Sequence, residues 1–340
     1  MDSYLVYFFS SSIIAYFFFK NFIKWAKVFK LLDKNDKFIV GNKYTPTGSG
    51  VVFFIIFLFG SIFFYNTIES FSSLLPNRFY VFYIVLVFLA LISLYDDYKL
   101  IDPILRLSLQ FVLIFFSTVS IPISNIELPF KLTLFLSIVF WIYIINITNF
   151  IDGLDGFLTN HSLFFFAGII LVQYLFSLNL FSFYISLLMI PILLVFYFFN
   201  KPIAKVYMGD AGSITLGFLI GFSLLELIFQ GYYLIAFSLY VYPLIDCSIT
   251  LIKKISRGHY PWDRLFDYFF LIPVMIGKKN HSFVFRIAFL FNLLNLVAIS
   301  LQILINKYFF LLSILLAIIN ICIYSQFSNN TAHVRNKKNH

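Results

Sequence analysis

The chain has 340 residues, of which 61% are hydrophobic and only 11% are charged. This composition is far too apolar for a soluble globular protein and excludes that class. The two cysteines, Cys247 and Cys322, both lie inside apolar runs, so we expect neither a disulfide framework nor a zinc site. A net charge of +9 could indicate nucleic acid as a partner, but the positions of the basic residues suit a membrane better.

Apolar runs of about 17–22 residues recur along the chain, and each can cross a bilayer core of about 30 Å as a helix. We therefore predict an all-α polytopic integral membrane protein with about eleven transmembrane helices. The first run, from Tyr4 to Phe19, lacks the basic start and cleavage site of a signal peptide, so we expect it to be retained. The predicted spans are residues 4–19, 50–66, 79–95, 104–121, 132–150, 160–177, 180–199, 213–230, 232–252, 284–304 and 308–325.

The basic residues indicate the orientation of the chain. Lysines and arginines gather at residues 20–43, 253–279 and 335–338, all on one predicted side, whereas the other side carries only Arg78, Lys131 and Lys307. Positive residues accumulate on the cytoplasmic side of membrane proteins. We therefore expect the N-terminus outside and the C-terminus inside the cell.

This topology predicts one transmembrane catalytic domain over residues 1–327 and a basic cytosolic tail over 328–340. Within the first loop, Phe22, Trp25 and Phe29 recur at helical spacing between lysines, which favours a connector lying on anionic lipid. The predicted cytosolic loops are residues 20–49, 96–103, 151–159, 200–212 and 253–283.

Most of the aspartates fall in short polar segments at the predicted cytosolic ends of spans. Asp96 and Asp97 close the third span, where adjacent like charges repel unless a cation is bound or one carboxyl is protonated. Magnesium takes oxygen ligands and keeps several waters, so one or two carboxylates plus phosphate oxygens suit it. An acidic stop signal at the membrane surface explains the pair equally well.

A second polar segment follows the fifth span. Its four polar residues recur every three positions, and they would form a slowly rotating stripe if the helix continued. They are Asn146, Asn149, Asp152 and Asp155. Gly153 and Gly156 each follow an aspartate, so the backbone can approach a phosphate closely there. The residues could share a metal and a sugar phosphate, and the alternative is a capping and turn cluster before the sixth span.

The third segment, residues 208–213, brings Asp210 to the start of the eighth span. A turn and helix cap is its simplest interpretation, although a helix N-terminus also favours an anion. Arg106 lies near the start of the fourth span and could either hold phosphate bidentately or snorkel to lipid headgroups. Asp246 falls in the cytosolic half of the ninth span, whereas Glu226 lies toward the opposite side and has no predicted role.

In order and placement these motifs resemble the polyprenyl-phosphate N-acetylhexosamine-1-phosphate transferases of glycosyl transferase family 4. One Asp-Gly-x-Asp-Gly match is weak evidence, but several ordered matches with a consistent topology are specific. The segments that carry the resemblance are Thr45-Pro-Thr-Gly-Ser-Gly50, Asp96-Asp97, residues 102–110, residues 146–156, residues 206–213, Tyr242-Pro-Leu-Ile-Asp246 and residues 253–258.

The resemblance implies an enzyme of the bacterial cytoplasmic membrane with its active site facing the cytosol. Members transfer a sugar 1-phosphate from a UDP-sugar to a lipid phosphate with magnesium. The implied partners are undecaprenyl phosphate, a UDP-N-acetyl sugar, Mg²⁺ (or Mn²⁺) and the lipid bilayer, with no nucleic acid; a homodimer is compatible with the sequence.

The resemblance also assigns residues to roles. It implies Asp210, Asp152 and Asn149 as metal ligands, and Asp96, Asp97, Asp152, Asp155 and Asp210 as the catalytic carboxylates. Its implied substrate contacts are Asn149, Arg106, Asn146, Asp246, Arg264 and His259. Asp96 is the predicted base that keeps the lipid phosphate deprotonated, although a second phosphate pKa of about 6 makes a strong base unnecessary.

One segment departs from the family pattern. After the basic stretch, Phe266 and Tyr268 stand where members usually carry histidines, although Asp263-Arg264 fits. His259 could substitute, or could simply lie in a solvated loop. We expect the aromatic run either to stack on the sugar or to lie in the membrane interface, and we favour the interface.

These differences favour the branch that initiates O-antigen, enterobacterial common antigen or capsule synthesis over the muramoyl-pentapeptide translocase. The predicted donor is then UDP-N-acetylglucosamine or a deoxy relative. Two alternatives stay open. A cation-coupled secondary transporter would place acids near the bilayer midplane and often show internal repeats, neither of which we find. A degenerate member would bind nucleotide-sugar without turnover, as the altered segment at Phe266 and Tyr268 allows.

Overall fold

The computed structural model describes residues 2–33, 45–73, 79–121, 128–261 and 267–328. The long helices are α1 (Asp2–Val28), α2 (Gly50–Thr67), α4 (Phe79–Tyr98), α5 (Pro103–Ser120), α6 (Phe130–Phe150), α7 (Phe157–Phe176), α8 (Phe181–Asn200), α9 (Gly209–Phe229), α11 (Val241–Ser256), α13 (His281–Leu304) and α14 (Phe310–Ser325). The shorter elements are α3 (Glu69–Ser73), α10 (Tyr233–Leu239), α12 (Ile272–Met275), the 3-10 helices η1 (Phe269–Leu271), η2 (Lys307–Phe309) and η3 (Gln326–Ser328), and the antiparallel strands β1 (Leu32–Asp33) and β2 (Thr45–Pro46).

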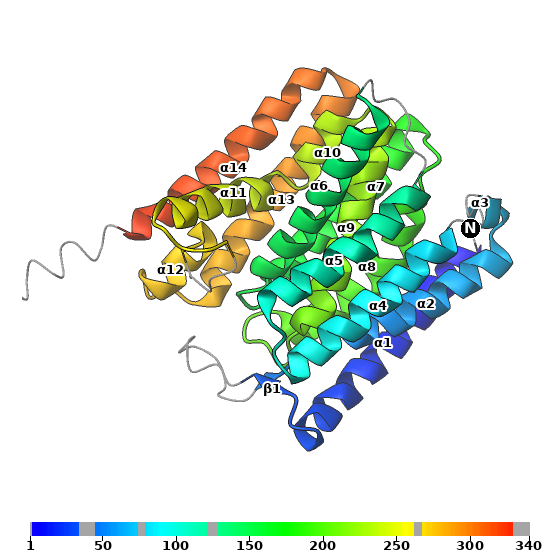
Figure 1. Cartoon of the computed structure of the whole chain (residues 1–340), viewed down its shortest axis with the longest axis horizontal. Coiled ribbons are helices and arrows are strands. Elements are labelled where there is room, and N and C mark those ends of the chain that lie inside the picture. The colour runs from blue at the N-terminus through cyan, green and yellow to red at the C-terminus, as the bar shows by residue number, and fades with distance from the viewer. Residues whose placement is uncertain (1, 34–44, 74–78, 122–127, 262–266, 329–340) are drawn as a thin grey trace, which may run out of the picture.

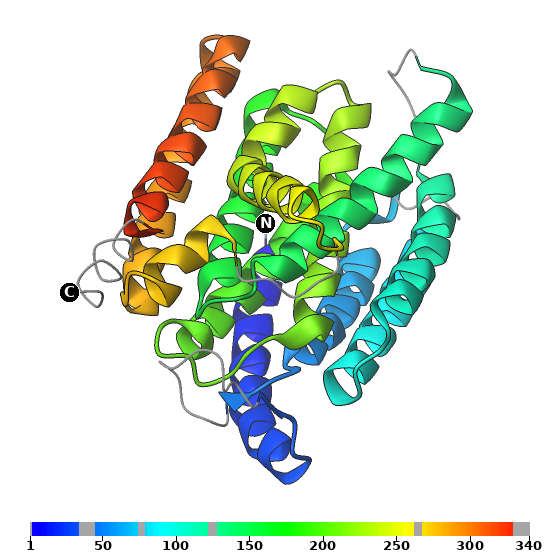
Figure 2. The same cartoon turned by 60° about the vertical axis from the view of Figure 1, so that its left-hand side comes forward.

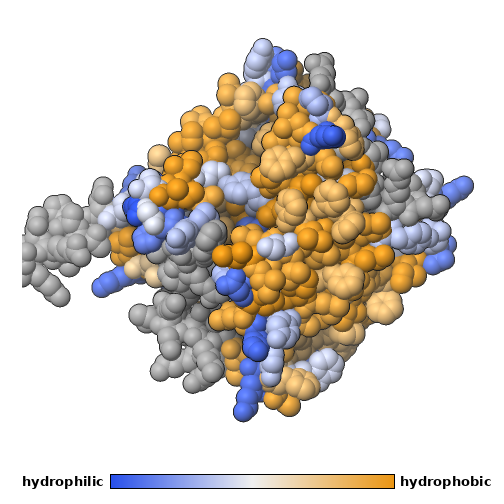
Figure 3. All heavy atoms as spheres, in the orientation of Figure 1, coloured by the Kyte–Doolittle hydropathy of each residue, from blue (hydrophilic) through white to orange (hydrophobic). Residues whose placement is uncertain are grey.

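The prediction of an all-α polytopic membrane protein is confirmed. Within the described residues, nine helices are long and apolar enough to span a membrane, and the bent pair α10 and α11 makes a tenth. The helices form one bundle (Figure 1) whose visible face is mainly apolar, with hydrophilic side chains toward its ends (Figure 3). The predicted span 104–121 corresponds to α5, whose apolar part, Pro103–Val119, is shorter than the other spans.

Two predicted boundaries are wrong. Helix α1 continues to Val28, so the beginning of the predicted loop 20–49 is the last two turns of the first helix. The predicted ninth span, 232–252, is broken at Tyr240, where α10 and α11 meet at 76°. Pro243 explains the break, because it lacks the N–H that would bond the carbonyl of Leu239 in a continuous helix, whereas the first turn of a new helix needs no such bond.

Helix α9 is the centre of the bundle, with 89% of its apolar window buried. Small residues let neighbouring helices approach it closely, as is common in membrane bundles. A Cβ on Gly221 would lie 2.2 Å from Cδ1 of Trp141 on α6, and the indole Nε1 of that tryptophan donates to the carbonyl of Phe218 at 2.9 Å. This packing fixes how far α9 can slide along its axis against α6. It therefore also fixes the position of Asp210 in the first turn of α9.

Glu226, which had no predicted role, anchors the opposite end of α9. Its carboxylate accepts the backbone N–H groups of Phe181 and Ser182, both at 2.8 Å, and so caps the start of α8. The N–H groups in the first turn of a helix have no acceptor within that helix. Inside a membrane no water can serve as the acceptor, so the carboxylate of Glu226 does so. Figure 2 shows the remaining helices α13 and α14 as a pair along one side of the bundle.

Candidate active site

Four helix ends meet at one end of the bundle and bring the sequence motifs together. Asp96 and Asp97 lie in the last turn of α4, and Asn149 lies in the last turn of α6. Arg106 lies in the first turns of α5, and Asp210 opens α9. We call these five residues the acidic site.

Arg106 links two acids of the acidic site that come from different helices. Its Nη1 donates to Oδ2 of Asp96 and to Oδ2 of Asp210, both at 2.9 Å. The side chain of Asp96 is 3% exposed and that of Asp210 is 30% exposed, so Asp210 is the acid that a substrate or cation can reach. The buried Nε of Arg106 has no hydrogen-bond partner within the described part of the chain.

The position of Arg106 follows from its local sequence. Asp102 caps α5 by accepting the N–H groups of Ile104 and Leu105, and Pro103 suits the first turn because its missing N–H would have no helical partner there. Oδ1 of Asp96 accepts the N–H of Ile101 at 2.6 Å, which ties the connection between α4 and α5 to the same carboxylate. The guanidinium is therefore held over Asp96 by the fold of one short connection.

Asp97 locks α4 to α9. Its two oxygens accept the N–H groups of Asp210 at 2.8 Å and Ala211 at 3.1 Å, so it caps α9 from another helix. The approach is so close that a Cβ on Gly209, whose φ is +70°, would lie 2.7 Å from the carboxylate. Asp97, which was predicted to be catalytic, therefore positions Asp210 through these two bonds.

Asn149 completes the site from α6. Its Nδ2 donates to Oδ1 of Asp210 and to Oγ of Ser213, both at 2.9 Å. Asn146, one turn earlier, donates instead to Oε1 of Gln110 on α5 at 3.0 Å, so it holds α5 against α6 beside the acidic site. Gln110 and Ser213 were not singled out from the sequence, although both lie inside motif segments that were.

The Asp-Gly-Leu-Asp-Gly segment is a turn and does not continue the helix. Helix α6 ends at Phe150 and α7 begins at Phe157, so the polar stripe does not run on as a helix through Asp152 and Asp155. Asp152 is half-buried in this turn, and its N–H donates to the carbonyl of Asn149 at 3.3 Å. It therefore stays close to the acidic site.

Asp155 faces the other way and is buried. Its Oδ2 accepts the N–H of Ala204 at 3.0 Å, and its Oδ1 lies 3.1 Å from Nδ1 of His281, the first residue of α13. Asp155 therefore joins the turn to the connection before α9 and to the start of α13. This arrangement does not support the predicted catalytic role of Asp155.

The segment 45–50 packs against the connection that leads into α9. The N–H of Tyr207 donates to the carbonyl of Pro46, and the N–H of Gly50 donates to that of Met208, both at 2.8 Å. A Cβ on Gly50 would lie only 1.9 Å from the backbone nitrogen of Gly212. Only glycine fits at this crossing. In the sequence, Gly50 stood out only because residues 45–50 resemble a segment of the family.

Asp246 is fully buried and positions a neighbouring turn. Its carboxylate accepts the hydroxyl of Tyr242 at 2.8 Å and the N–H groups of Phe269 and Phe270 at 3.0 and 3.3 Å, and Thr250 Oγ1 lies at 3.3 Å. The predicted substrate contact is therefore not supported, because the carboxylate is surrounded by internal donors. It ties α11 to η1.

The end of the aromatic run, Tyr268 to Phe270, lies inside the protein. Phe270 stacks on Phe157 with ring centres 4.5 Å apart, and Tyr268 packs against Phe150 at 5.9 Å. Burial raises the pKa of the Tyr268 phenol, so this side chain is neutral. The expectation that the aromatic run lies in the membrane interface is wrong for Tyr268, Phe269 and Phe270, which cover the turn after α6.

Two predicted substrate contacts gain no support from the structure. His259 is exposed just beyond the end of α11, and its N–H donates to the carbonyl of Lys254. Arg264, together with Asp263 and Phe266, lies outside the described residues.

The acidic site suits a hard cation that keeps water and substrate ligands. Within the residues that the structure describes, no three acidic, histidine or cysteine side chains are arranged as a metal cage. Magnesium rarely uses such a cage, because one or two carboxylates with phosphate oxygens satisfy it. Asp210 and the nearby Asp152 and Asn149 offer oxygen atoms of the required kind.

The sequence profile described as Glycosyl transferase family 4 matches residues 79–228. The matched region contains every residue of the acidic site together with Asp152 and Asp155. The match covers somewhat less than half of the chain and shows that this part is similar to that family.

Individual relatives carry a common name. The chain is 28% identical to the phospho-N-acetylmuramoyl-pentapeptide-transferase of Nautilia profundicola, over 86% of this chain and 92% of that protein. It is 26% identical to the protein of the same name from Campylobacter lari, over 87% and 94% of the two chains. A shorter stretch, 33% of this chain, is 40% identical to the Staphylococcus saprophyticus protein of that name. These names do not confirm the predicted O-antigen branch.

Proposed function

We propose that the protein transfers N-acetylhexosamine 1-phosphate from a UDP-sugar to undecaprenyl phosphate at the cytosolic face of a bacterial cytoplasmic membrane. An oxygen of the lipid phosphate attacks the β-phosphorus of the UDP-sugar. The bond from that phosphorus to the bridging oxygen breaks, and UMP leaves with the electron pair. The product is a lipid diphosphate sugar that starts a cell-surface glycan.

The observation that carries this proposal is the bridge from Asp96 through Arg106 to Asp210 at the meeting of four helix ends. Phosphoryl transfer needs positioning and stabilisation of charge more than covalent chemistry from the protein. The side chain of Arg106 is 17% exposed and can offer hydrogen bonds to phosphate oxygens, and the start of α9 favours an anion. A soluble donor and a lipid acceptor can both reach a site at the end of a membrane bundle.

Asp210, Asp152 and Asn149 are the residues that would hold the magnesium ion in this proposal. When bound, the ion supplies neutralisation of the diphosphate charge. Asp97 and Ser213 would keep Asp210 and Asn149 in place through the hydrogen bonds already described. Asp96 would remain paired with Arg106, and an acceptor phosphate with a second pKa of about 6 needs no strong base.

The names of the relatives favour a second donor, UDP-N-acetylmuramoyl-pentapeptide, in the same reaction. The two donors share the uridine diphosphate and differ in the group on the sugar. The proposed acidic site would act on the shared part, so it is compatible with both.

The test uses purified full-length protein in detergent with undecaprenyl phosphate and Mg²⁺, and it measures UMP release from each of several UDP-N-acetyl sugars and from UDP-N-acetylmuramoyl-pentapeptide. We expect UMP release with one class of donor, loss of release with EDTA, and recovery on adding Mg²⁺. Asp152→Asn and Asp210→Asn should lower kcat by about 100-fold or more. The matched control is Asp102→Asn, which keeps a good helix cap on an exposed residue and should retain activity.

The outcomes separate the alternatives. Binding of UDP-sugars without turnover would indicate a degenerate member of the family. Neither binding nor turnover would contradict the proposal and return attention to a transporter.

A further inference from the structure

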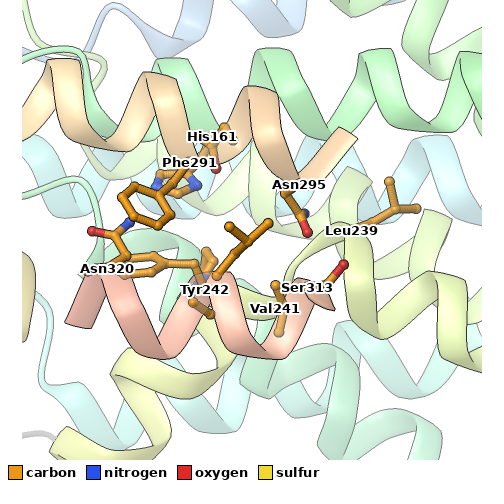
Figure 4. Close-up of a pocket in the computed structure, with 12 residues that line it drawn as sticks. His161, Leu239, Val241, Tyr242, Phe291, Asn295, Ser313 and Asn320 are labelled. Atoms are coloured by element: carbon orange, nitrogen blue, oxygen red, sulfur yellow. The ribbon is translucent and has the colours of Figure 1, made fainter. Parts of the chain in front are cut away.

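A pocket that includes no residue of the acidic site lies where α7, α13 and α14 face the break between α10 and α11 (Figure 4). We call it the polar pocket and define it by its polar lining: His161, Asn292, Asn295, Ser313 and Asn320. Polar side chains at this depth are costly in a membrane protein and need a partner.

Each of these five side chains has a buried polar atom without a hydrogen-bond partner among the described residues. The atoms are His161 Nε2, Asn292 Nδ2, Asn295 Oδ1, Ser313 Oγ and Asn320 Oδ1. Ser313 and Asn320 are at most 1% exposed, and His161 is 5% exposed. So many unpaired polar atoms lining one pocket indicate that something polar occupies it.

The chemistry of the atoms identifies the occupant. The Nδ2 of Asn295 donates to the carbonyl of Ser238 at 2.8 Å, which leaves its Oδ1 as an acceptor in the pocket. A bare cation could not pair with the amide nitrogen of Asn292, and an anion could not pair with the oxygen of Asn295. Water both donates and accepts. The pocket is only partly enclosed and has room of about 20 Å³, enough for one water molecule, since one needs at least about 10–15 Å³. One water bonds two to four partners, so it would pair with some of the five atoms.

We propose that the polar pocket is a water-binding site, and that the bound water joins the helix pair α13 and α14 to the broken span. The wall on the side of the break is Tyr242, whose ring stacks on His161 with ring centres 5.4 Å apart. The hydroxyl of the same tyrosine donates to Asp246, which holds η1 over the turn after α6. The water would therefore support Tyr242 and Asp246, the residues that hold η1 over the turn after α6. The proposal does not depend on the enzymatic activity.

Tyr240 and Tyr242 provide a matched pair for the test. Both are buried and belong to the break, but only Tyr242 lines the polar pocket, and the hydroxyl of Tyr240 is bonded to Thr148. X-ray radiolysis of the full chain in lipid nanodiscs converts bound water into hydroxyl radicals that oxidise neighbouring rings, and mass spectrometry reads the modified residue. We expect Tyr242 to be oxidised several-fold faster than Tyr240. Equal rates for the two tyrosines would overturn the proposal.

A second measurement looks for the water directly. An experimental density map of the wild-type chain that resolves ordered water should show a peak about 3 Å from at least two of the five atoms. An empty pocket, or a larger bound molecule, would overturn the proposal. In the double variant Ser313→Ala and Asn320→Leu, the oxidation of Tyr242 should fall to the rate of Tyr240, and an unchanged rate would also count against the proposal.

Discussion

The guanidinium of Arg106 bonds the carboxylate of Asp210 at 2.9 Å, although the two residues stand 104 positions apart in the chain. The same nitrogen also bonds Asp96, so one cation neutralises two acids at the ends of two different helices. Removing it would leave a nearly fully buried Asp96 without its partner, which is more costly than losing an exposed ion pair.

We expect Arg106→Lys to lower kcat for UMP release by about ten- to 100-fold even though the charge is kept. A lysine ammonium lacks the planar fork, and one lost hydrogen bond to a charged group is worth about 1.5–3 kcal/mol. Arg106→Gln should lose more, because it removes the charge as well. The comparison is steady-state UMP release at saturating donor, and a lysine variant as fast as wild type would show that the bridge does not matter.

Gly50→Ala should prevent normal folding. The added Cβ would lie 1.9 Å from the backbone nitrogen of Gly212, and backbone cannot move aside as a flexible side chain can. The matched control is Gly231→Ala, where nothing lies within 4 Å and only the φ of +88° opposes a side chain, at about 1–2 kcal/mol. Thermal unfolding in detergent compares the two variants. Equal unfolding temperatures would contradict the close crossing of α2 and α9.

Glu226→Ala should destabilise the protein without changing turnover per folded molecule. The change leaves the N–H groups of Phe181 and Ser182 without their acceptor, at about 1–3 kcal/mol each. Glu226→Gln keeps one acceptor oxygen, so its free energy of unfolding should fall by about half as much as that of Glu226→Ala. Unfolding temperatures and UMP release normalised to folded protein test both statements. A loss of turnover in folded Glu226→Gln would contradict a purely structural role at the end opposite the acidic site.

Asp246→Asn should loosen η1. The replacement keeps one acceptor oxygen but presents an NH2 group to donors that now bond a carboxylate. Losing one such bond, worth about 1.5–3 kcal/mol, should speed amide hydrogen exchange at Phe269 and Phe270 by about ten- to 100-fold. The control is Asp102→Asn at an exposed aspartate that caps α5, which should leave those amides unchanged. If the amides of Phe269 and Phe270 exchange at the same rate in both variants, Asp246 does not hold η1 in place.

The amino-acid sequence by itself determined the membrane class and most of the spans. Length and apolar content are local properties, and a run of about 20 apolar residues has few ways to fold other than as a spanning helix. The acids at the span ends were equally visible, because Asp96 and Asp210 interrupt or precede apolar runs. The orientation of the termini and the donor sugar stay predictions.

Only the tertiary structure decided which of those acids lie together. Asp155 and Asp246 looked like site residues in the sequence, yet each is buried among internal partners. The break at Tyr240 and the cap by Glu226 were not foreseen either. The physical reason is that a carboxylate's role depends on the donors around it, and those donors come from helices that only packing brings together.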